Sequence, residues 1–336
     1  MTLKIIKRAF LLAVLLFLSF SIWFAVEFLS LLNAPPKKIL LEIEKGSSVS
    51  QIASLLKEKE IIKRKWVFLT GYKLFFSRDT LKSGEYSIEL PVSTKNILRT
   101  LIEGKIYLHP ITIPEGLTQK EIASHLEAIH IISAEDFLRA SSDPSPILSF
   151  NDKASDLEGY LFPETYHFPK GVTGENIVKT MVAQFKSVFS SDWRIRAKEL
   201  GFSVREVVIL ASLIEKETSF ADEKKIISAV FHNRLKRRMK LDCDPTIIYA
   251  LKQQGIYSGR LRWKDLKLDS PYNTYIYPGL PPGPIANPGR ESLQAALFPA
   301  DVNYLYFVSK NDGTHIFSST LKEHQKAVIK YQIHGR

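Results

Sequence analysis

The residues best suited to chemistry lie in one helical segment, Ile209 to Phe220 (ILASLIEKETSF). At about 100° per residue, Leu210, Leu213 and Ile214 form an apolar stripe, and Glu217 projects from its middle. An apolar environment disfavours the charged form of a carboxyl group and so raises its pKa towards neutrality. Such an acid can protonate a glycosidic oxygen near pH 7, which makes Glu217 the candidate catalytic residue. The pattern leaves one alternative open, a glutamate paired with a core lysine or arginine.

Other charged or reactive side chains nearby have weaker claims. Glu215 falls on the other side of the same helix, next to Lys216, and ranks below Glu217 as the acid. Cys243 has no accompanying His/Asn pattern and is not expected to be a nucleophile. The basic run Arg234 to Lys240 closes a helix and is expected to be a solvated face, favourable to the helix dipole.

Short polar side chains in later segments are candidate substrate-binding groups. Their hydroxyl, amide and carboxyl groups are suited to hydrogen-bonding N-acetyl or hydroxyl groups, and a tyrosine can stack on a sugar face. The same side chains could instead cap helices and close turns, because Asp244 before Pro245 is also a favourable helix start. Glu164, in an aromatic-rich segment, could line a groove or simply order it. The predicted substrate-binding residues are Asp244, Thr246, Asn273, Thr274, Tyr275 and Glu164.

The composition narrows the class of protein. The chain has 336 residues, with 46 Lys+Arg against 35 Asp+Glu and a formal net charge of +11. A hydrophobic content of 45% excludes a disordered, collagen-like or polytopic membrane protein. The length allows about two or three compact units. One cysteine excludes a disulfide framework and a multi-cysteine metal site, and no GxGxxG, Walker or HExxH motif is present, so neither a cofactor nor a metal is expected.

The N-terminus predicts a membrane anchor. Three cations precede an uncharged run, Ala9 to Val26, which Glu27 interrupts before Phe28 to Leu32 continue it. The run is long enough to cross a hydrocarbon core of about 30 Å as a helix, predicted over residues 9–31 after a tail of residues 1–8. A cleaved signal peptide is the alternative, but the run exceeds the usual apolar core of roughly 7–15 residues and no small-x-small site follows it.

The cations Lys4, Lys7 and Arg8 set the expected orientation. By the positive-inside rule the tail stays in the cytoplasm and the rest of the chain lies outside. We therefore expect a single-pass protein of the cell inner membrane with a periplasmic catalytic domain. Nucleic acid is excluded as a partner by this topology, despite the basic charge.

The exported sequence predicts an α+β protein with two regions. A small α/β region is expected at residues 38–140 and a mixed catalytic domain at 141–332, after the turn-rich segment SSDPSP. A strand-turn-helix pattern recurs in the first region at an offset of 70 residues, with QIAS at 51–54 and EIAS at 121–124. Near the C-terminus, residues 305–308 and 315–318 are expected to pair around an Asn-Asp-Gly-Thr turn.

Several long segments, in the same order, resemble the endolytic murein transglycosylases of the MltG (YceG-like) family. They are LEGYLFPETY (157–166), ASLIEKET (211–218), VFHNRL (230–235), LDCDPTIIYAL (241–251), SPYNTYIYPGLPPGPIANPG (270–289), ESLQAALFPA (291–300), YLYFV (304–308) and HIFSST (315–320). The segment ASLIEKET resembles the catalytic helix of lytic transglycosylases, where a Glu-Ser pair follows a short apolar stretch. Here Glu217-Thr218 holds that place, with Thr in place of Ser.

The resemblance implies a fold and a reaction. The fold would combine a transmembrane helix, a LysM-like α/β subdomain at 38–140 and an α+β catalytic domain with a lysozyme-like catalytic helix. The reaction would be that of a lyase, cleaving MurNAc-GlcNAc β-1,4 bonds within nascent glycan strands and leaving 1,6-anhydro-MurNAc ends, so that the enzyme acts as a terminase of elongation. The family's catalytic Glu carries over to Glu217. The implied partners are peptidoglycan strands, inner-membrane lipid and peptidoglycan synthases or the division machinery.

Two other functions stay open on the sequence. One is a two-carboxylate glycoside hydrolase that uses Glu217 with Asp244 or Glu164, which would leave reducing ends rather than anhydro ends. The other is a non-catalytic glycan-binding scaffold, in which replacing Glu217 would have no consequence for the cell.

Overall fold

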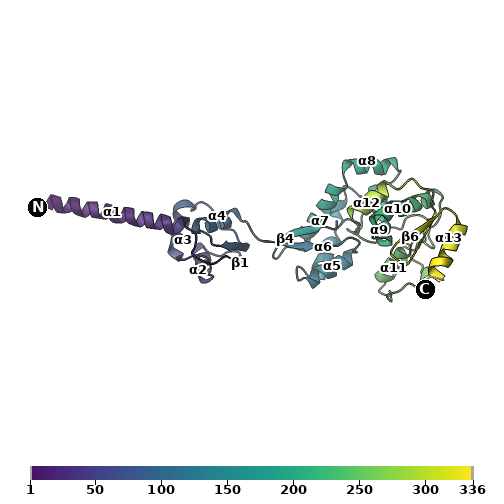
Figure 1. Ribbon diagram of the computed structural model, residues 1–336, viewed down its shortest axis with the longest axis horizontal. Helices are drawn as coiled ribbons and strands as arrows, with labels where there is room; N and C mark the ends of the chain where they lie inside the picture. Colours follow the sequence, from purple (N-terminus) through teal and green to yellow (C-terminus); the bar gives the residue numbers. More distant parts are fainter. Residues whose placement is uncertain (1, 334–336) are drawn as a thin grey trace. The chain divides into compact units, whose positions relative to one another are not determined.

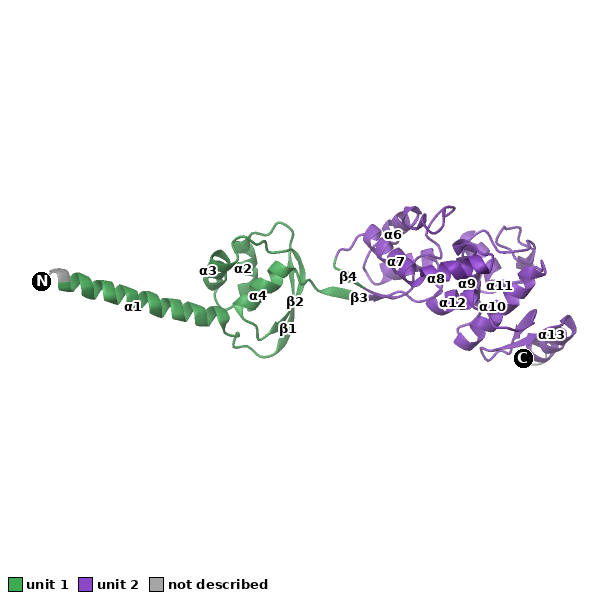
Figure 2. Ribbon diagram, turned by 90° about the horizontal axis from the view of Figure 1, so that it is seen from above, with its two compact units in different colours: residues 1–109, 167–170 green, residues 110–166, 171–336 purple. Residues whose placement is uncertain are grey.

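The computed structural model describes residues 2–333, with side chains from residue 4 onward. It is a mixed α+β protein in which helices dominate, and its strands form three separate two-stranded sheets. Contacts divide the chain into two compact units, shown in Figure 2: unit 1 holds residues 1–109 and 167–170, and unit 2 holds residues 110–166 and 171–336. Each unit is described by itself below.

Unit 1 is built from one antiparallel strand pair and four helices. In chain order these are α1 (Thr2–Leu29), β1 (Lys37–Ile43), α2 (Val49–Glu58), α3 (Lys65–Phe75), β2 (Gly84–Leu90) and α4 (Thr94–Glu103). The pairing of β1 with β2 runs from Lys37 opposite Leu90 to Ile43 opposite Gly84. The core beneath this sheet contains Leu41, Ile43, Leu56 and Tyr86.

The last turns of helix α1 contribute side chains to the core of unit 1. Phe24 and Phe28 are 8% and 4% exposed and lie in the same apolar cluster as the strand residues. The helix is long and apolar enough to cross a membrane from Lys4 to Leu29. A helix was predicted over residues 9–31; the structure has α1 over Thr2–Leu29, and Figure 1 shows its C-terminal end beside α3.

Unit 2 begins with a strand pair and continues mainly with helices. Its elements are β3 (Leu108–Thr112), α5 (Gln119–Ala128), α6 (Ala134–Ser141), η1 (Ser145–Ile147), β4 (Thr165–Pro169), α7 (Gly174–Val188), α8 (Ser191–Glu199), α9 (Val204–Glu217), α10 (Ala221–Lys236), α11 (Asp244–Gln253), η2 (Asp265–Lys267), α12 (Arg290–Leu297), β5 (Tyr306–Ser309), β6 (His315–Ser318), α13 (Leu321–Val328) and the π-helix η3 (Ile329–Ile333). Strand β3 pairs with β4, and the division between the units runs through both strands. The C-terminal hairpin is confirmed, with Tyr306 opposite Ser318 and Ser309 opposite His315.

The repeated sequence pattern has the same local structure in both copies. Ser48 and Gln51 form a capping box at the start of α2, and Thr118 and Glu121 do so at the start of α5. Both helices follow a glycine with positive φ, +88° and +76°. The second copy lies in unit 2, where α5 packs on α6 and α6 on α7. The contacts therefore divide the chain at residue 109, before the expected boundary at 140, because α5 buries its apolar face with the helices that follow it.

Helix α9 is the centre of unit 2. A capping box of Ser203 and Glu206 fixes its start, and every residue from Val207 to Ile214 is buried. It packs against α8, α10, α11 and α12, which surround it in Figure 1. A helix that is apolar on all sides is held by contacts around its whole circumference, so the direction of the side chains at its end is well defined.

Candidate active site

Glu217 is the last residue of α9. The chain leaves the helix at Thr218 in an extended conformation, with φ −148° and ψ 142°. Glu217 lines a pocket of about 550 Å³, to which β5, β6, α13 and η3 also contribute residues. Its Oε1 accepts a hydrogen bond of 3.0 Å from the Cys243 thiol. Within residues 4–333, no lysine or arginine forms an ion pair with Glu217.

The electrostatics of the pocket favour the protonated form of Glu217. The pKa of Glu217 is raised from 4.5 to about 7, chiefly by burial; the hydrogen bond from Cys243 opposes this shift and the negative charge of Asp244 adds to it. The thiol donor cannot itself ionise near neutral pH, since burial and Glu217 raise the pKa of Cys243 well above its usual value. A carboxyl group with a pKa of about 7 can give up or accept a proton near neutral pH.

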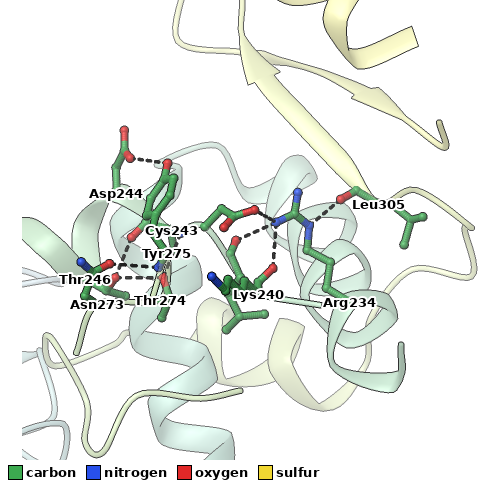
Figure 3. A network of polar contacts seen from close by, with 11 residues as sticks. Arg234, Lys240, Cys243, Asp244, Thr246, Asn273, Thr274, Tyr275 and Leu305 are labelled. Atoms are coloured by element: carbon green, nitrogen blue, oxygen red, sulfur yellow. Dashed lines mark hydrogen bonds and ion pairs between the residues drawn. The ribbon is translucent and has the colours of Figure 1, made fainter. Parts of the chain in front are cut away.

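Two of the predicted substrate-binding residues line this pocket. Asp244 begins α11, and its Oδ1 accepts a hydrogen bond of 2.7 Å from the Tyr275 hydroxyl. Figure 3 shows this pair at the edge of the polar network around Cys243. Burial and the Asp244 carboxylate raise the pKa of Tyr275, so its hydroxyl keeps its proton and orients the carboxylate.

Three other predicted residues lie beneath the pocket, with no exposed polar group. Thr246, Asn273 and Thr274 are at most 1% exposed. The Thr274 hydroxyl accepts a bond of 3.0 Å from the Cys243 backbone N–H and lies 3.0 Å from the Thr246 hydroxyl. The Asn273 amide donates to two backbone carbonyls of its own loop and accepts from Tyr275 N–H. These side chains join the two loops that present Cys243, Asp244 and Tyr275 (Figure 3).

The two remaining acids, Glu164 and Glu215, lie away from this pocket's lining. Glu164 is exposed, and its Oε1 accepts from the Thr165 N–H at 3.0 Å. The helical periodicity placed Glu215 on the side of the helix away from the apolar stripe. In the structure, however, its side chain is only 8% exposed. Glu215 accepts from Ser292 Oγ at 2.6 Å and Gly289 N–H at 3.1 Å, and lies 3.5 Å from the Lys224 ammonium.

Sequence reasoning missed part of the pocket wall. Arg234 was expected on a solvated face, yet it is 7% exposed. Its guanidinium donates to the Leu305 carbonyl at 2.6 Å and to Asp242 Oδ2 at 2.8 Å, so it ties α10 to the C-terminal hairpin (Figure 3). The arginine is a helix-end cation by sequence, and no residue pattern distinguishes it from its exposed neighbours.

A histidine–carboxylate pair was also missed. His315 lines the pocket, and its Nδ1 lies 2.7 Å from Glu223 Oε2, which orients the ring. His324 lines the same wall and stacks on Tyr306 at 5.1 Å. The two histidines are nine residues apart on different elements, so only the fold brings them together.

Glu158 is a second buried carboxyl group, outside the pocket lining. Burial raises its pKa to about 8. Its oxygens accept bonds of 3.0 and 3.1 Å from the Gln119 N–H and one of 2.9 Å from the Asn287 side chain. It therefore joins the start of α5 to the loop before α12, which explains an acid inside the apolar segment LEGYLF.

Fold and pocket together define a class: an α+β protein whose central helix presents a carboxyl group without a cation partner to a polar pocket. The sequence profile of the YceG-like family matches residues 41–330. The chain belongs to the YceG-like family.

Individual relatives agree with this assignment. An endolytic murein transglycosylase of Bacillus subtilis is 38% identical over 87% of this chain and 84% of its own length. One of Streptococcus pneumoniae is 29% identical over 96% of this chain, which spans 65% of that relative. A crystal structure of a YceG-like protein from Listeria monocytogenes matches 87% of this chain and all of its own with a TM-score of 0.58 and 37% identity.

Proposed function

We propose that this chain is a membrane-anchored endolytic lytic transglycosylase of peptidoglycan, with Glu217 as its single acid and base. One observation carries the proposal: Glu217 lines an open pocket at the end of α9 with a thiol as its hydrogen-bond donor, where burial raises its pKa to about 7. The names of the relatives, endolytic murein transglycosylases, supply the substrate class.

The reaction needs one group that first gives and then takes a proton. Protonated Glu217 donates to the glycosidic oxygen between MurNAc and GlcNAc as the C1–O bond breaks. The resulting carboxylate then accepts the proton of the MurNAc C6 hydroxyl while that oxygen bonds to C1. The products are a 1,6-anhydro-MurNAc end and a free GlcNAc 4-hydroxyl, with no water consumed and Glu217 protonated again.

The walls of the pocket supply partners for the sugars. Asp244, Tyr275 and His315 line the same pocket as Glu217, and the Tyr275 hydroxyl donates to the Asp244 carboxylate. These groups are suited to hydroxyl and N-acetyl substituents. Thr246, Asn273 and Thr274 act indirectly, by holding the two loops in register. Glu164 has no role at this pocket in the proposal.

The setting of the enzyme follows from its N-terminus. Helix α1 anchors the chain in the inner membrane, with residues 1–8 in the cytoplasm and the chain after α1 in the periplasm. The order β1-α2-α3-β2 with antiparallel strands supports a LysM-like first unit. Acting within nascent strands from this position, the enzyme would terminate elongation beside the peptidoglycan synthases.

A two-carboxylate hydrolase is the second candidate, favoured by Asp244 in the same pocket as Glu217. Mass spectrometry of the products from purified sacculi separates the two. The lyase yields 1,6-anhydro ends in wild-type digests and none with Glu217→Gln. Reducing ends would instead identify the hydrolase, and undiminished cleavage by Glu217→Gln would reject Glu217 altogether.

A further inference from the structure

Helices α1 and α3 pack closely through aromatic side chains in unit 1. The ring of Trp66, at the start of α3, stacks on Phe20 and Trp23 with centroids 5.9 and 5.3 Å apart. At the other end of α3, Phe75 stacks on Phe28 at 5.4 Å. The last third of the apolar helix α1 therefore lies against α3 along its length.

A glycine makes this contact possible. A Cβ on Gly71, in the middle of α3, would lie 2.3 Å from Cε2 of Phe28, closer than carbon atoms can approach. Glycine weakens a helix interior, so its presence here is explained by the close approach of α1. The two helices are consequently held in one arrangement rather than loosely associated.

The length of a membrane span determines the depth of α3. Crossing about 30 Å of hydrocarbon takes ~20 helical residues. Counted from Ala9, after the last cation, such a span ends near Phe28; counted from Lys4, it ends near Trp23. Both residues contact α3 or its Trp66. Wherever the span begins, α3 lies at the level where α1 leaves the hydrocarbon.

The exposed side chains of α3 are those expected at that level. Leu74 is 63% exposed, Phe75 60% and Trp66 37%. Trp66 and Leu74 are eight residues apart, which places them on one side of the helix. Residues 63–78 contain five cations and no acid. Aromatic side chains flanked by lysine and arginine are typical of surfaces that bind anionic membranes.

Two further features of α1 and α3 fit a lipid environment. Glu27 interrupts the apolar run of α1, and it lies 3.7 Å from the Lys63 ammonium and 3.5 Å from the Arg64 guanidinium. An apolar cleft of about 320 Å³ opens between the two helices, and Lys95 is the one charged residue in its lining. An acyl chain with an anionic headgroup matches both the apolar wall and the cation.

We propose that α3 docks on the bilayer that holds α1, as a second membrane contact of unit 1. Trp66, Leu74 and Phe75 lie at the boundary between headgroups and acyl chains, and the cations of residues 63–78 bind anionic phospholipid headgroups. This inference rests on the proposed anchoring by α1. With this second contact, unit 1 is bound directly to the membrane surface and is not connected to it by a flexible spacer alone.

Site-specific fluorescence quenching in vesicles tests this arrangement. The full chain receives one added cysteine, Leu74→Cys, Glu44→Cys or Leu16→Cys, and an NBD label. The vesicles contain phosphatidylglycerol and phosphatidylethanolamine with doxyl lipids, spin-labelled either near the headgroup or deep in the acyl chain. Glu44 is exposed beyond the far end of β1 and serves as the matched control. The unsubstituted chain controls for labelling of the buried Cys243.

We expect the shallow quencher to reduce the emission at position 74 about twofold or more, and to leave position 44 unchanged. Replacing phosphatidylglycerol by phosphatidylcholine, or introducing Lys73→Glu with Arg78→Glu, should weaken the quenching at position 74. Deep quenching at position 16 reports the anchor separately. An unquenched label at position 74 with a quenched label at 16 overturns the docking and leaves the anchor intact. An unquenched label at 16 rejects the anchor and the docking together.

Discussion

Two carboxyl groups, Glu215 and Glu217, lie two residues apart on α9 in opposite environments. Glu215 accepts hydrogen bonds from Ser292 and Gly289 and lies beside the Lys224 ammonium. Glu217 accepts a single bond from a thiol and has no cation beside it within the described chain. Glu215 therefore has a cation and two donors beside it, whereas Glu217 has one thiol donor and a pKa that burial raises to about 7.

Two residues of one helix can have opposite surroundings, because different elements pack against each of them. Donors to a carboxylate favour its charged form, and burial without such donors disfavours it. Glu215 joins α9 to α10 and α12, and so holds the helix whose last residue is Glu217. One acid of the pair is therefore structural support for the other.

The largest expected effect separates the two acids by rate. Glu217→Gln removes the proton donor while keeping the shape of the side chain, and should lower the cleavage rate by about 10²–10⁴-fold. Glu215→Gln should cleave sacculi within a few-fold of wild type under conditions in which it stays folded. Initial rates of muropeptide release measure both variants. Equal losses of cleavage rate in Glu217→Gln and Glu215→Gln would contradict the different roles proposed for the two acids.

The second effect separates them by stability. Glu215→Gln leaves the Lys224 ammonium, whose side chain is 4% exposed, with only Glu115 and Glu291 at 3.8 and 3.9 Å. Uncompensated burial of that charge should cost about 2–4 kcal/mol, lowered from the full penalty by the two remaining acids. Calorimetry of the full chain in detergent measures the change. The double variant Glu215→Leu with Lys224→Met should recover much of it, and no recovery would contradict the ion-pair origin.

The sequence pointed to Glu217 because the apolar residues Leu213 and Ile214 lie one turn before it in the same helix, whereas the pocket that it lines comes from other elements. The partners of Glu215 come from α10 and α12, so the periodicity of its own helix could not predict that its side chain is buried. Thr246 and Thr274 were predicted to bind substrate because they carry hydroxyl groups. The sequence does not show whether such a hydroxyl group faces a sugar or a buried loop, and here both form buried hydrogen bonds. The C-terminal hairpin depends on a short-range turn pattern and was predicted correctly.

A third test uses pH. The folded-state pKa of Glu217, about 7, lies above its unfolded value of 4.5, so the folded protein binds the extra proton between these values. Stability therefore falls as the pH rises through that window and levels off above it. Glu217→Gln should remove about 1–3 kcal/mol of this dependence, whereas the similar contribution of Glu158 remains in both proteins. If the free energies of unfolding of wild type and variant changed with pH in the same way between pH 5 and 8, Glu217 would not be the source of this dependence.

The smallest effects concern the two neighbours that tune Glu217. After burial, the Asp244 carboxylate raises the pKa of Glu217, and the Cys243 thiol lowers it by donating a hydrogen bond. In a profile of kcat/KM against pH, the fall at high pH reports ionisation of the acid. Asp244→Asn should move this high-pH limb to lower pH, and Cys243→Ala should move it to higher pH. Each shift should be smaller than the one caused by burial. Because Asp244 also lines the pocket, the readout is the position of the limb in kcat/KM rather than its height. Two shifts of the same sign would mean that the variants act through the shape of the loop and not through the charge and hydrogen bond at Glu217.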